Sequence, residues 1–256
     1  MNIFFLVLAR DKRHVSEKIE ELASLGMPYL IVCGESVGRP NVVYREPKGK
    51  YDAINFGFKF VPEDTDVVVL NDVDTRIVNF EAALQLSRLE YVDLVFVRVS
   101  VGEGPQNLFY GFLDSIRRRV LVAASGELML IKYSVLKEIV PIRPCKAEDS
   151  YILFKALEYK HHCVFCEKCY VETERTKTAE KEEIYKRKTV SGIYQALAYS
   201  NPPYSIKFFY ALLPFFCVLL LFSGSRGYFW TKGIISGFTD YLRGDRSGSW
   251  QQTYMK

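Results

Sequence analysis

Val67-Val68-Val69-Leu70-Asn71-Asp72-Val73-Asp74 is the stretch of sequence that says most about the fold. An apolar run of this length is typical of a strand buried on both faces, as in a parallel sheet covered by helices. Such a strand carries Asp72 and Asp74 to its carboxyl end, where open α/β sheets bind their ligands. Two carboxylates there suit Mg²⁺ or Mn²⁺ and, with the metal, a phosphate-bearing substrate. The same Asp-x-Asp pattern is also typical of a solvated turn after a strand.

Strand-like and helix-like segments alternate on both sides of this stretch. The apolar patterns predict strands over 3–8, 29–33, 41–44, 67–70, 93–99, 128–131 and 163–171, and helices over 15–25, 51–60, 80–89 and 150–159. This alternation favours a mostly parallel, Rossmann-like sheet flanked by helices. The expected fold class is therefore α/β. The alternation of strands and helices ends after the last of these strands.

The composition argues against a dedicated nucleic-acid-binding protein and favours a cytoplasmic setting. The 256 residues include 34 basic and 30 acidic ones, for a net charge of +4, a balance too even for a dedicated nucleic-acid binder. The apolar start of the chain has neither the basic leader nor the small-residue cleavage site of a signal peptide. The six cysteines lack the spacing of a disulfide framework, which favours a reducing compartment.

A second apolar region lies near the C-terminus. After Pro202-Pro203, residues 206–222 carry a single charge, that of Lys207. The charge-free part amounts to roughly 22 Å of helix, against about 30 Å for the hydrocarbon core of a bilayer. Residues 228–242 have the aromatic, amphipathic character of an interfacial segment. We predict that residues 201–256 attach the chain to a membrane by spanning, re-entering or lying on it; a buried helix of a soluble protein is the alternative.

Three further clusters carry polar residues that suit chemistry. Lys50 follows a glycine at a helix start, where the helix N-terminus favours a phosphate; an exposed lysine at a loop-to-helix junction is the plainer interpretation. Glu148 and Asp149 stand before a helix, either as caps or with one carboxylate acting as a general base. Gly126 and Glu127 form a turn into a strand, which either admits a substrate close to the backbone or simply reverses the chain.

In this order the clusters resemble the family-2 glycosyltransferases, which have a GT-A fold. The matching segments are Ala9-Arg10-Asp11, Lys50-Tyr51-Asp52-Ala53-Ile54-Asn55-Phe56-Gly57, Asn71-Asp72-Val73-Asp74, Gly126-Glu127-Leu128-Met129, Glu148-Asp149 and Tyr185-Lys186-Arg187-Lys188-Thr189-Val190-Ser191-Gly192. The resemblance covers residues 1–200, which are the expected catalytic domain.

The resemblance implies a metal-dependent, inverting transfer of a sugar from a nucleotide-diphosphate sugar. Asp72 and Asp74 would hold Mg²⁺ or Mn²⁺, and Asp149 would be the catalytic base that activates the acceptor. The donor side would comprise Ala9, Arg10, Asp11, Glu35, Lys50, Asn55, Asp72, Lys186, Arg187 and Lys188. The acceptor side would comprise Gly126, Glu127 and Glu148.

Three of the implied donor-side cations lie in a stretch crowded with both charges, residues 172–188. We expect this stretch to be a mobile loop leading into a solvated helix. Lys186, Arg187 and Lys188 would then close over the donor phosphates as a lid and exclude water. A solvated charged face without such a role is the alternative.

The chain departs from the family pattern at two places. Cys33-Gly34-Glu35-Ser36 stands where many relatives carry Asp-Asp, so Glu35 is the only acid available there to contact the nucleotide. Tyr185 and Thr189 replace the glutamine and tryptophan of the Gln-x-x-Arg-Trp segment, on which processive polymer synthases rely. With a single short apolar segment as well, the sequence favours transfer of one sugar over polymer extrusion.

The run His161-His162-Cys163-x-x-Cys166-x-x-Cys169 has the spacing of metal ligands. The same run also has the pattern of a strand, which would put Cys163 and Cys169 on one face and Cys166 on the other. Because the sulfurs would then be divided between two faces, we predict buried, inert cysteines.

The expected partners are a nucleotide-sugar donor, a polyprenyl-linked lipid or glycan acceptor, and a membrane, with the catalytic domain facing the cytoplasm. A catalytically silent GT-A scaffold that docks partners at the membrane stays open, although it has no need for Lys50, Asp72, Asp74 and Asp149 together. A nucleotidyltransferase also stays open, although residues 9–14 lack the glycines of its phosphate loop.

Overall fold

The computed structural model describes residues 1–102, 107–174 and 178–245. Strands of these residues form one sheet in the order β3-β2-β1-β4-β7-β6-β8-β5. Their bounds are β1 (Ile3–Ala9), β2 (Tyr29–Cys33), β3 (Val42–Tyr44), β4 (Val67–Asp72), β5 (Thr75–Val78), β6 (Leu94–Val101), β7 (Leu128–Lys132) and β8 (Cys163–Thr173). The four strands from β3 to β4 are parallel, so the predicted α/β fold with a mostly parallel sheet is confirmed.

The reversed strand β7 determines which loops meet at the edge of the sheet. It runs antiparallel to both β4 and β6. Asn71, near the end of β4, therefore pairs with Leu128, the first residue of β7. As a result, the turn before β7 lies at the same edge as the carboxyl ends of β1 and β4.

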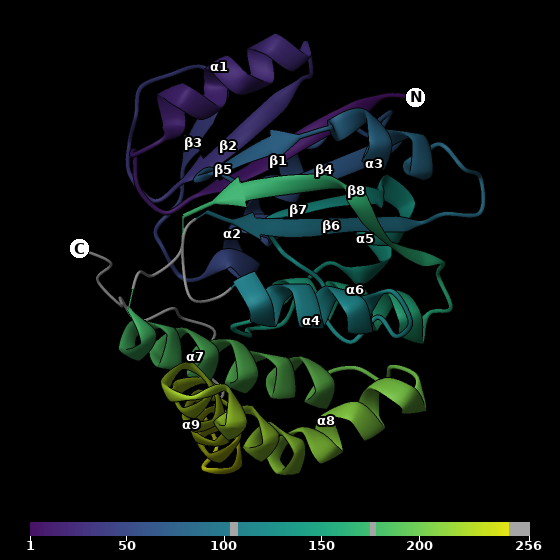
Figure 1. The fold of residues 1–256 in the computed structure, drawn as a ribbon. Coiled ribbons are helices and arrows are strands. Elements are labelled where there is room, and N and C mark those ends of the chain that lie inside the picture. The colour runs from purple at the N-terminus through teal and green to yellow at the C-terminus, as the bar shows by residue number, and fades with distance from the viewer. Residues whose placement is uncertain (103–106, 175–177, 246–256) are drawn as a thin grey trace.

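Helices cover both faces of the sheet (Figure 1). On one face lie α1 (Val15–Leu25) and α3 (Phe80–Ser87), and on the other α2 (Lys50–Gly57), α4 (Asn107–Arg117), α5 (Tyr133–Ile139) and α6 (Glu148–Glu158). Side chains of β1 alternate between the two faces, as strand geometry requires. Phe5 is buried in the cluster beneath α1, whereas Leu6 is buried in the cluster on the side of α2 and α6.

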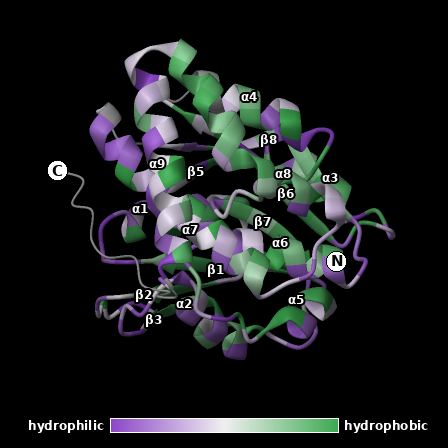
Figure 2. Cartoon of the chain, turned by 90° about the horizontal axis from the view of Figure 1, so that it is seen from below, coloured by the Kyte–Doolittle hydropathy of each residue, from purple (hydrophilic) through white to green (hydrophobic). Residues whose placement is uncertain are grey.

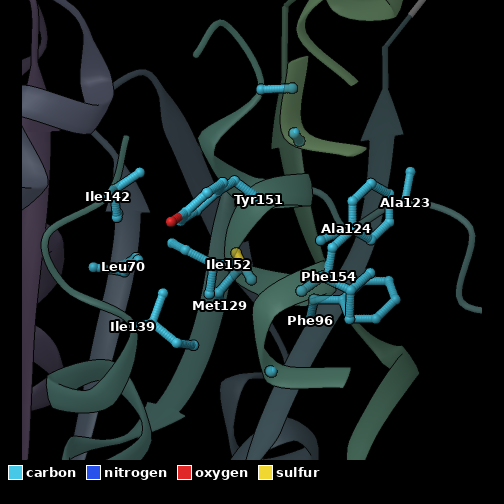
Figure 3. Close-up of a cluster of buried hydrophobic side chains, with 14 of the residues drawn as sticks. Leu70, Phe96, Ala123, Ala124, Met129, Ile139, Ile142, Tyr151, Ile152 and Phe154 are labelled. Carbon is cyan, nitrogen blue, oxygen red and sulfur yellow. The ribbon is translucent and has the colours of Figure 1, made fainter. Parts of the chain in front are cut away.

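Helix α6 is anchored in the larger of the two buried clusters (Figure 3). Ile152 and Phe154 of α6 join Leu70 of β4, Phe96 of β6 and Met129 of β7, and each of these side chains is at most 2% exposed. Because one face of α6 is buried in this way, its first turn has a fixed position at the edge of the sheet.

The C-terminal helices form a further layer beneath α4 and α6 (Figure 1). They are α7 (Ala179–Ala198), α8 (Tyr204–Phe216), the 3₁₀ helix η2 (Cys217–Ser223) and α9 (Ser225–Leu242). Helix α9 lies close against α7: a Cβ on Gly237 would be 2.4 Å from the carbonyl oxygen of Arg187. Ile206, Tyr210 and Ile234 belong to the same buried cluster as α6. The layer therefore packs on the domain, and the division at residue 200 stays a prediction.

The charged stretch before residue 188 differs from its expected form. It was expected to lead into a solvated helix, but Glu182 and Lys186 of α7 are only 1% and 8% exposed. Trp230 of α9 covers both side chains, donating a hydrogen bond to Glu182 and placing its ring 3.7 Å from Nζ of Lys186. The prediction of a solvated face is therefore wrong for these residues, because α9 shields them from water.

All six cysteines are free and buried. Burial was predicted for Cys163, Cys166 and Cys169, but the expected placement of Cys169 on the same face as Cys163 is wrong. Cys163 lies in the cluster beside α6, whereas Cys166 and Cys169 both lie in the cluster beneath α1. An irregularity in β8 is the cause: Val97 pairs with Cys166, but the next residue of β6 pairs with Tyr170. The extra residues of this bulge turn Cys169 to the same face as Cys166.

Candidate active site

A lysine links two acids at the edge of the sheet. Lys50, the first residue of α2, donates to Oδ2 of Asp72 at the end of β4 across 2.5 Å. Its Nζ also lies 3.8 Å from Oε1 of Glu148, the first residue of α6. Lys50 was predicted to meet a donor phosphate; in the structure it joins β4 to α6, and its contact with a donor stays a prediction.

Burial determines the charges of this cluster. It raises the pKa of Asp72 to about 6, against the opposing charge of Lys50. It raises the pKa of Glu148 to about 8, also against Lys50. Burial alone would lower the pKa of Lys50, but the charges of Asp72 and Glu148 outweigh it and raise that pKa. Near pH 7 the cluster therefore holds a protonated Glu148 beside an ionised Lys50–Asp72 pair.

Asp149 is held by backbone groups from two elements. Its Oδ2 accepts a hydrogen bond of 3.0 Å from the N–H of Gly126, and its Oδ1 accepts one of 2.6 Å from the N–H of Ser150. Burial raises the pKa of Asp149, the negative charge of Glu127 adds to the rise, and the Ser150 N–H opposes it. A half-buried carboxylate with a raised pKa is suited to accept a proton.

Gly126 is required by the position of Asp149. A Cβ at residue 126 would lie 3.0 Å from Cβ and 3.3 Å from Cγ of Asp149. The sequence left open whether this glycine admits a substrate or simply reverses the chain. In the structure the absence of a Cβ makes room for the side chain of Asp149, and the acceptor-side role of Gly126 stays a prediction. Gly126 and Asp149, which are distant along the chain, meet because β7 is reversed.

The residues at the end of β4 fit a divalent cation. Oδ1 of Asp72 is buried and has no hydrogen-bond partner, and Asp74 is exposed two residues later. Across 1–102, 107–174 and 178–245, no third histidine, cysteine or acid completes a group with them. Mg²⁺ is commonly held by one or two carboxylates together with substrate phosphates, so Asp72 and Asp74 remain the predicted metal ligands.

The turn that carries Asp74 has a buried support that the sequence did not reveal. Lys18 of α1 is 2% exposed, and its Nζ donates to Oδ1 of Asn71 at 2.9 Å and also to the carbonyl oxygen of Thr75. Burial lowers the pKa of Lys18, against the charge of Glu21. In the sequence Lys18 looks like any lysine on an amphipathic helix, so no local pattern would have found it.

The predicted donor-side residues of the first two loops lie together. The backbone N–H of Lys12 donates to Oε2 of Glu35 at 3.4 Å, and a Cβ on Gly34 would be 2.1 Å from the carbonyl oxygen of Arg10. The loop after β1, which begins with Arg10 and Asp11 next to the last strand residue Ala9, therefore contacts the loop after β2. The side chain of Asp11 is paired with Arg13 at 2.8 Å. The roles of these residues toward a donor stay predictions.

Asn55, also predicted on the donor side, is engaged by the backbone of Ile142. Its Nδ2 donates to the Ile142 carbonyl oxygen at 2.9 Å, and its Oδ1 accepts from the Ile142 N–H at 2.8 Å. This side chain joins α2 to the segment after α5. Any contact between Asn55 and a donor stays a prediction.

The three cations of the expected lid belong to helix α7 and point to different partners. Lys186 is buried over the Trp230 ring. Arg187 pairs with Asp240 of α9 through contacts of 2.5 and 2.7 Å. The third is half-buried: burial and the positive charges of Lys146 and Arg10 lower the pKa of Lys188. Of the three, Lys188 is therefore the one whose surroundings fit an anionic ligand. Lys146, which the sequence did not indicate, lies near it, but its own ammonium group is paired with the carboxylate of Asp245.

A cavity of about 150 Å³ opens beside Asp149. It lies between the edge of the sheet and the C-terminal helices and is lined by Val99, Tyr110, Leu113, Arg117, Ala123, Ala124, Ser125, Glu127, Asp149, Ser150, Tyr185, Lys186, Thr189, Val190, Ile193, Phe209, Tyr210, Leu213, Trp230 and Ile234. No sequence motif indicated this cavity, because its walls come from elements far apart in the chain.

Comparison with solved structures establishes the type of fold. The mannosyltransferase PcManGT from Pyrobaculum calidifontis, in complex with GDP-Man and Mn²⁺, matches 94% of this chain and 87% of its own, with a TM-score of 0.71 and 15% identity. The chain has a GT-A-like fold. No family model matches it, and no curated protein resembles it in sequence.

Two other solved structures share the GT-A-like fold over a smaller part of the chain. A mycobacterial protein matches 76% of this chain and 74% of its own at a TM-score of 0.54 and 14% identity. The glucosyl-3-phosphoglycerate synthase of M. tuberculosis matches 76% and 80%, at a TM-score of 0.51 and 13% identity. At such identities the likeness concerns the fold, and the residues of this chain carry the argument about chemistry.

Proposed function

We propose that the chain is an inverting, family-2-like glycosyltransferase that moves one sugar from a nucleotide-diphosphate sugar to an acceptor hydroxyl. One observation carries the proposal: Asp149 is held by Gly126 on the wall of a cavity, at the sheet edge that also presents the Lys50–Asp72 pair. The GT-A-like fold supports it.

On the donor side, Asp72 and Asp74 are the proposed ligands of Mg²⁺ or Mn²⁺, which when bound supplies positive charge to the departing diphosphate. Lys50 holds the Asp72 carboxylate in place through its 2.5 Å contact. Lys188 and Arg10, whose charge helps to depress the pKa of Lys188, supply a positive field for the diphosphate.

On the acceptor side, Asp149 is the proposed general base. Its carboxylate accepts the proton of the acceptor hydroxyl while that oxygen forms a bond to the anomeric carbon of the sugar. The bond from this carbon to the diphosphate oxygen breaks on the opposite side, so the configuration inverts. The raised pKa of Asp149, which follows from burial and the charge of Glu127, makes the carboxylate a stronger base.

The outer face of the C-terminal layer supports a membrane location. Among the described residues, the helix Tyr204–Ser223 is long and apolar enough to cross a membrane, with a mean hydropathy of 2.1 and only 17% of its most apolar window buried. Figure 2 shows a largely hydrophobic stretch along α8. Its exposed side chains include Phe208, Phe215, Phe216, Leu219 and Phe222. Exposed apolar patches of this kind suit a lipid surface.

The path of the chain supports a location in one leaflet instead of a crossing. Thr231 of α9 donates a hydrogen bond of 2.7 Å to the carbonyl oxygen of Cys217 in η2. Trp230 in turn binds Glu182 of α7. Helix α9 returns along α7, and this path keeps α8 and η2 against the domain. We propose that this layer rests in the cytoplasmic leaflet, beside an acceptor that is a lipid-linked molecule or a glycan.

Calorimetry on the purified full-length chain tests the proposed function. UDP-, GDP- and dTDP-sugars are titrated with and without Mn²⁺ into the wild type, Asp74→Ala and Asp149→Asn. The expected result is Mn²⁺-dependent binding of one nucleotide class that is lost in Asp74→Ala and kept in Asp149→Asn. Folded protein that binds none of the donors contradicts the proposal and favours a silent scaffold.

A further inference from the structure

The cavity beside Asp149 is apolar over most of its wall. Asp149, Ser150 and Glu127 line one side, where the proposed chemistry takes place. The other walls are mainly aliphatic and aromatic, with Leu113 and Tyr110 from α4, Val190 and Ile193 from α7, Phe209 and Leu213 from α8, and Trp230 and Ile234 from α9. Two cations also line them, but Arg117 donates to the carbonyl oxygens of Ala123 and Ala124, and the ammonium group of Lys186 lies over the Trp230 ring. The space next to the candidate base is therefore suited to hydrocarbon.

The helix that closes the cavity also presents the exposed apolar face. Phe209 and Leu213 of α8 line the cavity, whereas Phe208 and Phe215 of the same helix are 66% and 73% exposed. Residues four apart in the sequence lie on the same side of a helix, whereas adjacent residues lie on different sides. A single helix therefore separates the cavity from the surface proposed to rest in lipid.

The chemistry of the wall distinguishes the two kinds of acceptor left open. A sugar placed against it would lose the hydration of several hydroxyls, and a hydroxyl left without a hydrogen bond in an apolar cavity is destabilised. A hydrocarbon group, in contrast, is stabilised when its surface is removed from water. An apolar cavity of about 150 Å³ is large enough for a benzene-sized group, comparable to one branched segment of a lipid chain.

We propose that this cavity is the acceptor site and that it binds the hydrocarbon segment next to the reacting hydroxyl of a membrane lipid. The hydroxyl lies at Asp149, and the rest of the chain leaves past α8 and α9 into the leaflet. This inference rests on the proposed function and deepens it, because it selects a lipid acceptor over a glycan.

The fluorescence of Trp230 provides a direct binding measurement. The chain has two tryptophans, at residues 230 and 250, so Trp250→Phe leaves Trp230, on the cavity wall, as the single reporter. Geraniol, a branched ten-carbon alcohol, is the probe, and maltose is its polar counterpart. We expect a saturable change in Trp230 emission with geraniol and none with maltose.

A matched pair of variants locates the binding. Leu213→Phe adds volume inside the cavity, whereas Leu242→Phe makes the same change at a residue that is 64% exposed at the end of α9. Because overpacking costs about 1–3 kcal/mol, we expect Leu213→Phe to weaken geraniol binding by roughly tenfold or more. Leu242→Phe should leave geraniol binding unchanged.

Donor binding separates the possible failures. Thermal unfolding of both variants establishes that they are folded, and calorimetry establishes that each binds the nucleotide sugar of the wild type. If geraniol does not bind, or if both variants weaken its binding equally, the proposed lipid acceptor site is wrong. If donor binding is intact in that case, the proposed glycosyltransferase function is unaffected. Loss of donor binding in the wild type itself overturns the function on which the inference rests.

Discussion

The backbone N–H of Gly126 donates a hydrogen bond of 3.0 Å to Oδ2 of Asp149 and joins the turn before β7 to the first turn of α6. The other carboxylate oxygen accepts from Ser150 within α6. With both oxygens held, the carboxylate has one orientation at the cavity wall. Backbone groups of two elements therefore fix the direction in which the proposed base acts.

Gly126→Ala should displace this base. The new Cβ would lie 3.0 Å from Cβ of Asp149, which is tighter than side chains normally tolerate. A misplacement of the order of 1 Å at the reacting centre costs up to about 100-fold in rate. The contact at residue 126 calls for a shift of only a few tenths of an ångström, so we expect kcat to fall by roughly 3- to 10-fold while the Kd for the donor is unchanged. Steady-state kinetics and calorimetry measure the two quantities. Gly102→Ala, where a Cβ meets nothing within 4 Å, is the control, and equal kcat values for the two variants would contradict the assignment.

Lys50→Met should destabilise the protein mainly at high pH. The substitution removes the cation 2.5 Å from Asp72, so ionising that buried carboxyl group becomes more costly. We expect a loss of about 1–3 kcal/mol in the free energy of unfolding at pH 8. The loss should be smaller at pH 5, below the pKa of about 6 that Asp72 has beside Lys50. Urea denaturation at both pH values measures the effect, and a loss independent of pH argues against the ion pair as its cause.

Glu148→Gln should change the pH dependence of stability. Burial raises the pKa of Glu148 in the folded state from 4.5 to about 8. The folded protein therefore binds this proton more tightly than the unfolded chain, and the stabilisation present below pH 4.5 is lost as the pH rises through 8. Glutamine does not titrate. The free energy of unfolding of the variant should therefore rise relative to that of the wild type by at most about 1.4 kcal/mol per pH unit between pH 4.5 and 8. Chemical denaturation from pH 5 to 9 measures this gain; parallel profiles would show that Glu148 titrates normally.

Gly237→Ala should weaken the packing of α9 on α7. A Cβ at this position would be 2.4 Å from the carbonyl oxygen of Arg187, so the helices would have to separate. We expect a loss of about 1–3 kcal/mol in the free energy of unfolding. Gly111→Ala is the matched control, because its Cβ meets nothing within 4 Å in helix α4 and alanine should stabilise that helix by about 1 kcal/mol. Urea denaturation compares the two; similar effects would mean that α9 does not pack closely on α7.

Paired substitutions on the outer face should abolish the proposed membrane binding. Phe215 and Phe222 are 73% and 91% exposed, and their rings are expected to enter the leaflet. In vesicle flotation the wild type should rise with the lipid, whereas Phe215→Ser/Phe222→Ser should stay in the aqueous fraction. Phe112→Ser, at an exposed residue of α4, should float like the wild type. Flotation of the double variant would place the membrane contact elsewhere.

Much of the fold follows from local pattern. Helix α1 and strand β2 have the predicted bounds, because their apolar spacing and the glycine after α1 are properties of adjacent residues. Strand β5 was not predicted: it is short, and it forms only by pairing with the distant strand β8. Helices α4 and α5 were likewise not predicted from pattern.

The candidate site was predictable only in part, for the same physical reason. The order of motifs suggested Asp72, Asp74 and Asp149, but the contact of Asp149 with Gly126 depends on the reversal of β7. Lys186 looked solvated because Trp230, which covers it, belongs to a helix far along the chain. The buried Lys18 bonds to Asn71 across another long separation. Tertiary contacts of this kind leave no local trace in the sequence.

The burial of every cysteine has a practical consequence for measuring how the protein sits on lipid. All six thiols are enclosed, and burial raises the pKa of Cys145, Cys163 and Cys169 further from the range in which thiolates form. The natural chain should therefore be nearly inert to maleimides while folded. A cysteine introduced in place of Phe222 would be the one readily labelled position. The emission of an environment-sensitive dye attached there would report how deeply this end of the C-terminal layer inserts into lipid.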